Sequence, residues 1–322
     1  MLRFLIGRLV KIVIILFAIA VLNFCLIHMA PGDPALVMAG EAGDADPKFL
    51  AELRSQFGLD QPIHIQLWTY LSHMAQLDLG YSYRQQASVG ALILDRLPAT
   101  LILSLTAFAI SLGLGVLAGV IAAARQGSWS DSVISTVALL FYATPLFWMA
   151  LMAVLLFSVT LGWLPAFGYE KAASDLTGIA RAVDILRHLI LPATTLGLFF
   201  MATYVRITRA SMLEVNRLDF VKTARAKGLR NSVIQRRHVL RNAILPVVTL
   251  AGLHAGQLVG GAVLIETVFA WPGIGRLMYE ALQSRDYNLL LGVFTVSAGL
   301  VLMFNLITDI LYRVVDPRIR IS

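Results

Sequence analysis

Five polar side chains stand inside long apolar runs of this sequence, and the ionisable ones among them could carry or bind a proton. They are His254, Gln257, Glu266, Asn305 and Asp309. Ionisable residues inside a membrane are costly to bury, so they are functional candidates by default. His254 and Gln257 could line a pathway for a solute, although hydrogen bonding between buried helices explains the pair equally well.

The two carboxylates in this set favour structural roles. Glu266 is expected at the outer border of its apolar run, where orienting a neighbouring segment explains it better than carrying protons. Asp309 is expected near the inner end of the last run, and a buried carboxylate is usually paired with a cation. We expect Arg206 or Arg209 to be that cation.

A basic segment between two apolar runs has the strongest pattern in the chain. From Arg206 to Pro246 it carries ten Lys/Arg residues against two acids, Glu214 and Asp219. Such a segment cannot lie in lipid, and its charge favours the cytoplasmic side of a membrane. Residues 209–245, called the basic loop below, are therefore predicted to be cytoplasmic.

The basic loop predicts two short helices joined by a turn. The first helix starts at Asp219, Gly228 allows the turn, and the second helix begins near Asn231 or Ser232. A rigid helix pair between two spans suits insertion into a groove of a soluble partner. The alternative, a loop that only attracts lipid headgroups, needs no such pattern. The predicted contact residues are Asp219, Phe220, Thr223, Ala224, Arg225, Ala226, Lys227, Gly228 and Leu229, with Phe220, Ala224 and Leu229 on or near one side of the first helix.

The composition excludes most soluble classes of protein. Hydrophobic residues make up 58% of the 322 residues and charged residues 14%, which is typical of a chain that crosses a membrane several times. The net charge of +7 would suit nucleic acid, but the basic residues cluster beside apolar runs, so that partner is not expected. Cys25 is the single cysteine; it excludes disulfides within the chain and indicates inert packing. Phosphate-loop, zinc-protease and serine-hydrolase motifs are absent, so no catalytic, cofactor or metal site is expected.

Apolar windows of about twenty residues predict six membrane spans. The first follows Arg3, Arg8 and Lys11, is longer than the apolar core of a secretory signal and lacks a small-residue cleavage pattern, so we expect it to be uncleaved. Placing both termini in the cytoplasm puts 17 of the 26 Lys/Arg residues on that side. The predicted spans cover residues 10–29, 99–122, 134–160, 190–208, 246–269 and 289–312, with a cytoplasmic tail at 313–322.

The longest predicted external segment, residues 30–98, is expected to carry structure of its own. Residues 47–57 and 62–77 each predict a helix, and the segment holds eight acids. We expect a small helical cap that docks something outside the membrane, because long ordered loops tend to be functional. A linker lying on the membrane surface is the alternative.

Small residues recur four apart in two of the predicted spans. Glycines at this spacing let helix backbones approach closely in lipid. The spacing does not separate packing within one subunit from packing between subunits. The two sets are Ser111, Gly115 and Gly119 in the second span, and Gly252, Gly256 and Gly260 in the fifth.

Together these motifs resemble the membrane subunits of ATP-binding-cassette (ABC) importers, and specifically the first permease of the dipeptide/oligopeptide/nickel family. Thr223-Ala-Arg-Ala-Lys-Gly228 with Ile244-Leu-Pro246 is similar to the cytoplasmic coupling signature of such permeases. Lys222-Thr-Ala224 stands where the general signature has Glu-Ala-Ala, and the distance from Gly228 to Ile244 is longer; both departures are usual in the peptide branch. The resemblance covers the whole chain, with further matches at Pro31-Gly-Asp-Pro34, Asp78-Leu-Gly-Tyr-Ser82, Arg96-Leu-Pro98, 266–276, Arg285-Asp-Tyr287 and Asp316-Pro-Arg318.

The resemblance implies an all-α polytopic fold of the type I ABC importer kind, as one permease domain of residues 1–322. It also implies a bacterial inner membrane location and a role in uptake of short peptides or related solutes, glutathione, opines and nickel complexes included. The implied partners are a second similar permease, two cytoplasmic ATPases that bind ATP and Mg²⁺, and an external solute-binding protein. The competing functions are a secondary transporter, with His254, Glu266 or Asp309 carrying protons, and a membrane scaffold or receptor.

Overall fold

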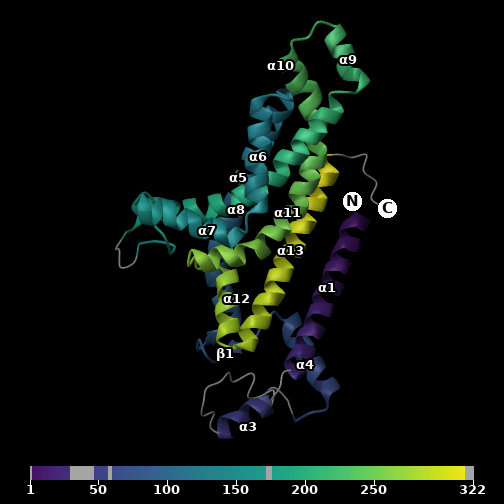
Figure 1. Ribbon diagram of the computed structural model, residues 1–322. Coiled ribbons are helices and arrows are strands. Elements are labelled where there is room, and N and C mark those ends of the chain that lie inside the picture. Colours follow the sequence, from purple (N-terminus) through teal and green to yellow (C-terminus); the bar gives the residue numbers. More distant parts are fainter. Residues whose placement is uncertain (1, 30–46, 57–59, 172–175, 316–322) are drawn as a thin grey trace. The chain divides into compact units, whose positions relative to one another are not determined.

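The structure is a computed structural model that describes residues 2–29, 47–56, 60–171 and 176–315, and these residues are almost entirely helical (Figure 1). The chain divides into two compact units. The first comprises residues 1–100 and 272–306, and the second comprises residues 101–271 and 307–322. Two long helices, α5 (Val89–Ala124) and α13 (Tyr287–Val315), contribute to both units.

The first unit is built around the N-terminal helix and the external segment. Its core joins Val89 and Ile93 of α5 to residues from Ile274 to Val293. Thr100 caps the start of α12, where its hydroxyl accepts the N–H of Ile274 at 2.7 Å. Besides parts of α5 and α13, the unit holds α1 (Leu2–Met29), α3 (Pro47–Gln56), α4 (Ile63–Ala75), the antiparallel pair β1 (Tyr81–Ser82) and β2 (Ala87–Ser88), and α12 (Ile274–Gln283).

The external segment contains the two predicted helices with slightly different bounds. Helix α3 lies within the predicted range 47–57 and α4 within 62–77, while residues 30–46 fall outside the described part of the chain. Within the strand pair, Ser82 of β1 donates its hydroxyl hydrogen to Asp286 just before α13, and both side chains are buried. The segment is thus tied to the start of α13 by a buried polar contact.

Helix α8 (Gly178–Val215) is the centre of the second unit. It packs against α6 (Trp129–Ala143), α7 (Leu146–Ala153) and α11 (Leu240–Val268). Its predicted span, 190–208, has the weakest apolar signal of the six, and the structure gives the reason. In its apolar window 56% of residues are buried inside the protein, against 17% for α1, so α8 faces protein more than lipid.

Four helices in the described part of the chain are long and apolar enough to cross a membrane: α1, α5, α8 and α13. A fifth crossing results if a bent pair, residues 129–160, counts as one span. The fifth predicted span, 246–269, lies in α11, where the side chains of residues 257–261 are not described. Six spans therefore remain a prediction. Cys25, predicted as a packed side chain, is exposed on α1.

The predicted span 134–160 is bent by 104° instead of forming one straight helix. Helix α6 ends at Ala143, and α7 starts at Leu146 and continues into the π-helical segment η1 (Val154–Thr160). The break lies at Thr144 and Pro145. Proline has no N–H to donate and disfavours a helical conformation at the preceding residue, and Thr144 is extended, with ψ 131°.

Candidate functional site

The basic loop forms the helix pair that its sequence predicts, at the far end of the α8–α11 pair (Figure 1). Helix α9 covers Asp219–Ala226, α10 covers Asn231–Val233, and the π-helical segment η2 covers Ile234–Val239. Gly228 stands between the helices with a φ of +76°. The N–H of Leu229 bonds the carbonyl of Ala224 at 3.4 Å, and that of Gly228 bonds Arg225 at 2.9 Å. This pair of bonds is a Schellman C-cap, which needs a left-handed residue at the position of Gly228.

Helix α9 is held on the rest of the second unit by one apolar face. Val221 and Ala224 are buried against Met212 of α8, Ile234 of η2 and Ala123 of α5. The prediction that Phe220, Ala224 and Leu229 share one apolar side is therefore wrong in one respect. Ala224 points inward, whereas Phe220 and Leu229 are 42% and 41% exposed. The buried face of α9 packs against the rest of the second unit, and the apolar side chains of Phe220 and Leu229 stay partly exposed.

Polar contacts fasten the loop at its base. Gln235 of η2 donates to Asn216 Oδ1 at 2.9 Å, and Arg225 of α9 donates to the same oxygen at 3.3 Å. On the outer side of α9, Lys222 Nζ lies 2.8 Å from Asp219 Oδ1 and lowers the pKa of that exposed carboxyl. Asn216 therefore connects the end of α8 to both α9 and η2.

The π-helical segment η2 lies in the interval between Gly228 and Ile244, which the resemblance implies is longer than in the general signature. A π-helical turn takes one more residue than an α-helical turn, and such turns are frequent at functional sites. The extra length is accommodated without a break before α11.

An ion pair that the sequence reasoning missed joins Asp131 to Arg209. Arg209 Nε lies 2.7 Å from Asp131 Oδ1 and Nη2 lies 2.8 Å from Oδ2, while the N–H of Gly127 also donates to Oδ2. Asp131 is buried at the first turn of α6, where Ser128 is the N-cap. The sequence signal that could have identified Asp131 is its spacing from Ser128, because a serine followed three residues later by an acid is typical of a helix N-terminus. Arg209, proposed as a partner of Asp309, makes this two-pronged contact instead, and Arg206 lies 5.9 Å from the ring centre of Tyr142.

Gly115 and Gly119 of α5 pack against another helix of this chain. A Cβ at Gly115 would lie 2.5 Å from the Cβ of Tyr204, and one at Gly119 would lie 2.6 Å from the Cβ of Thr208, so α8 approaches α5 at both positions. Gly197 of α8 makes the same kind of approach to Ile110, which the spacing argument did not include. Ser111, from the same predicted face, is also buried.

The described glycines of α11 are also buried within this chain. Gly252 and Gly256 are buried, and the carbonyl of Gly252 accepts the hydroxyl of Thr308 at 3.2 Å. The packing environment of Gly260 lies outside the described part of the structure. Packing within one subunit therefore explains Gly115 and Gly119, and a subunit interface is not needed for these two.

The polar residues of the apolar runs fall in different environments. His254 is half-buried between the rings of Phe200 and Tyr204, each 5.5 Å away, and its buried Nδ1 has no hydrogen-bond partner among the described residues. The side chain of Gln257 lies outside the described residues. Glu266 is fully buried, and its carbonyl accepts the N–H of Trp271 at 2.8 Å. Within the described part of the chain, no three His, Cys, Asp or Glu side chains lie close enough to hold a metal ion.

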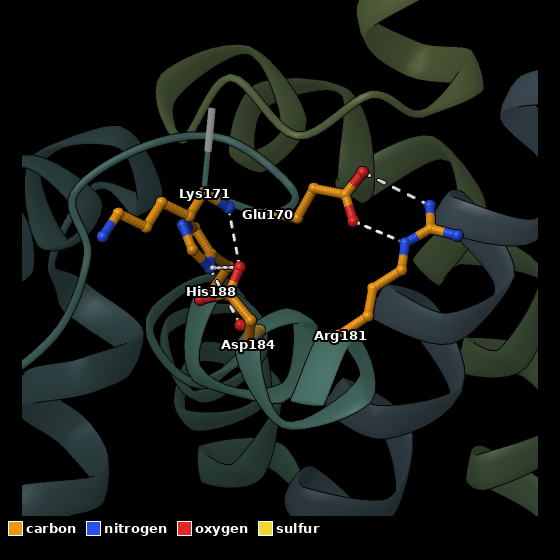
Figure 2. Close-up of polar contacts among 5 residues, drawn as sticks. All are labelled: Glu170, Lys171, Arg181, Asp184 and His188. Carbon is orange, nitrogen blue, oxygen red and sulfur yellow. Dashed lines mark hydrogen bonds and ion pairs between the residues drawn. The ribbon is translucent and has the colours of Figure 1, made fainter. Parts of the chain in front are cut away.

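A polar cluster fixes the start of α8 (Figure 2). Arg181 forms two bonds with Glu170, at 2.6 and 3.3 Å, and Asp184 accepts the backbone N–H of Lys171 at 2.6 Å. His188 Nδ1 lies 2.9 Å from the carbonyl oxygen of Asp184. These contacts hold the segment before α8 against its first turns, on the predicted external side.

Comparisons with known proteins agree with these features. Residues 115–321 match the family described as binding-protein-dependent transport system inner membrane component, and residues 1–106 match the N-terminal region of such components. The chain is 42% identical to the di/tripeptide transport system permease protein DppB of Pseudomonas aeruginosa, with 99% of each chain covered. It is 39% identical to the dipeptide transport system permease protein DppB of Escherichia coli K12, again with 99% of each covered.

The solved structures that resemble this chain share its fold at low sequence identity. A chain of the inward-facing MetNI methionine ABC transporter is 18% identical with a TM-score of 0.56, covering 70% of this chain and 96% of that one. A chain of an amino acid ABC transporter is 15% identical with a TM-score of 0.52, covering 70% and 94%. The predicted all-α ABC importer fold is confirmed.

Proposed function

This chain belongs to the family of inner membrane components of binding-protein-dependent transport systems, and we propose that with a second, similar permease it forms the pathway by which short peptides enter a bacterium. An external binding protein delivers the peptide, and two cytoplasmic ATPases, which bind ATP and Mg²⁺, drive the cycle. Both termini of this chain lie in the cytoplasm. Peptides are proposed because full-length relatives are named as di/tripeptide and dipeptide permeases.

The observation that carries this proposal is the two-faced packing of α9. Val221 and Ala224 bind the helix to its own protein, while Phe220 and Leu229 stay exposed beside basic side chains. An exposed apolar pair, Phe220 on a rigid short helix and Leu229 just after the turn that ends it, suits insertion into a groove of a partner. We propose that residues 219–229 dock on one ATPase and transmit its movement to α8 and α11 through the cluster around Val221.

The family also bears on the competing functions. A transport system that depends on a binding protein differs from a secondary transporter, in which His254, Glu266 or Asp309 would carry the coupling protons. His254 and Gln257 remain proposed as pathway-lining groups, not as proton carriers.

Copurification tests the assembly. A tagged chain, coexpressed with its partner subunits, is expected to bring down a second permease and two ATPases. Replacing both Phe220 and Leu229 by Ala should remove the ATPases and keep the second permease, because only exposed side chains of α9 and of the turn after it are changed. Leu253→Ala, at a side chain 57% exposed on α11, is the matched control. If the double variant retained both ATPases at wild-type amounts, residues 219–229 would not be the docking site.

Substitutions at Gly228 test the coupling of ATP hydrolysis to uptake separately from the assembly of the subunits. No atom lies within 4 Å of a Cβ at this position, so a substitution acts through the positive φ alone. Gly228→Val should cost roughly 1–2 kcal/mol at the turn and uncouple ATP hydrolysis from uptake, because a β-branched residue disfavours this conformation. Gly228→Asn, which tolerates it, should stay near wild type. Normal ATP-driven uptake by Gly228→Val in proteoliposomes would contradict the coupling role.

A further inference from the structure

A hollow of about 530 Å³ lies at the base of the basic loop, entirely within the second unit. Its wall comes from five separate places: the end of α5, the turn before α6, the end of α8, helix α9 and the start of the α10–η2 arm. The residues of this hollow, called the basic groove below, are Ala123, Ala124, Arg125, Gln126, Ser128, Leu213, Asn216, Arg217, Arg225, Asn231 and Gln235.

Three exposed arginines from three different segments line the basic groove. Arg125 follows α5, Arg217 follows α8, and Arg225 belongs to α9. No carboxylate is among the lining residues. In the part of the chain that the structure describes, Arg125 and Arg217 form no ion pair, and Arg225 bonds only the neutral oxygen of Asn216.

Two nearby acids are engaged in ion pairs, while Glu214 is exposed at the end of α8 and is not among the lining residues. Asp131 is held by Arg209 in a two-pronged contact, and Asp219 by Lys222 at 2.8 Å. The other polar lining groups are amides and a hydroxyl, which can donate or accept a hydrogen bond. The groove therefore combines excess positive charge with neutral hydrogen-bonding groups.

We propose that the basic groove binds a phosphate group, either that of an anionic lipid headgroup or that of a soluble phosphate ester. One carboxylate suits a single guanidinium fork, whereas a phosphate offers enough oxygens for three. The hollow is also larger than one carboxylate side chain would fill. Simple attraction of basic loops to a membrane requires no such convergence of segments.

A bound phosphate would connect α9 to the ends of α5 and α8. Arg125 follows α5 and Arg217 follows α8, while Arg225 is carried by α9 together with the residues proposed to dock on the ATPase. Occupancy of the groove would hold α9 in its present position against these helix ends. The regulatory consequence rests on the proposed function, but phosphate binding itself does not.

Binding is measured on the purified full-length chain without ATPases, so that failure of ATPase docking leaves the result unaffected. The probes are phosphatidylglycerol retained by the protein after extraction from phosphatidylcholine nanodiscs doped with it, counted by native mass spectrometry, and inorganic pyrophosphate, titrated by calorimetry at fixed ionic strength. The test variant replaces Arg125, Arg217 and Arg225 by Gln. The control variant replaces Arg230, Arg236 and Arg237 by Gln, which removes the same charge from the loop outside the groove.

The groove variant should bind the preferred probe roughly tenfold less than wild type, because charge-assisted hydrogen bonds are lost, while the control variant changes little. Retention of phosphatidylglycerol without pyrophosphate binding identifies a lipid headgroup as the source; pyrophosphate binding identifies a soluble phosphate. Equal losses in both variants would overturn the proposal, since bulk charge would then explain them. Wild-type protein that binds neither probe would overturn it as well. Replacing the same three arginines by Lys, which keeps the charge and loses the fork, should weaken binding without abolishing it.

Discussion

Arg209 holds Asp131 by two parallel hydrogen bonds of 2.7 and 2.8 Å across 78 positions of sequence. The carboxylate is buried at the start of α6, and the guanidinium is partly exposed on α8. The pair lies near the base of the basic loop, where α6 packs on α8. It fixes the register between these two helices close to the proposed docking site.

Asp131→Asn is expected to lower the free energy of unfolding by about 2–3 kcal/mol, because Arg209 loses its charged partner while its partial exposure softens the loss. Thermal unfolding in detergent measures the effect. Arg209→Gln should cost a similar amount, and the double variant should cost less than the sum of the two. Additive losses in the double variant would show that the two side chains act independently.

Gly115→Ala should destabilise the chain by roughly 1–3 kcal/mol, because the new methyl group would meet Tyr204 on α8 in a packed interface. Gly113→Ala is the matched control on the same helix, since no atom lies within 4 Å of a Cβ there. That control should be neutral or stabilise the helix by up to about 1 kcal/mol. Comparison of melting temperatures checks both. Equal melting temperatures for the two variants would mean that α8 does not approach Gly115 this closely.

Asp78 predicts a pH dependence for the turn after α4. Its carboxylate accepts the N–H of Gly80 at 3.0 Å and faces His73 Nδ1 at 2.9 Å, and these contacts, that of Gly80 first, hold the pKa of Asp78 below its ordinary 3.8. A lowered pKa stabilises the fold above the ordinary value, and this contribution is lost as the pH falls through the lowered one.

In the wild type the melting temperature should fall as the pH drops below 3.8. Asp78→Asn should make that fall smaller without reversing it. Asp60→Asn, which removes an exposed carboxylate, is the control and should leave the drop as in wild type. An unchanged acid response in Asp78→Asn would show that this turn does not contribute to it.

Much of the local architecture was available from sequence. Apolar runs located the long helices, Asp219 and Gly228 bounded α9, and the Thr144–Pro145 pair carried the information for the bend, although the sequence argument did not use it. These features depend on residues within a few positions of one another, because helix periodicity, caps and proline act on the adjacent backbone.

The sequence by itself thus determined that this is an all-α membrane protein with a basic helix pair between two apolar runs, and its motifs were sufficient to indicate the family. Only the tertiary structure decided that Arg209 binds Asp131, that Ala224 faces inward, that α5 glycines meet α8, and that three arginines share one groove. Such contacts join side chains tens of positions apart. They depend on how whole helices pack against one another, which local propensity does not specify.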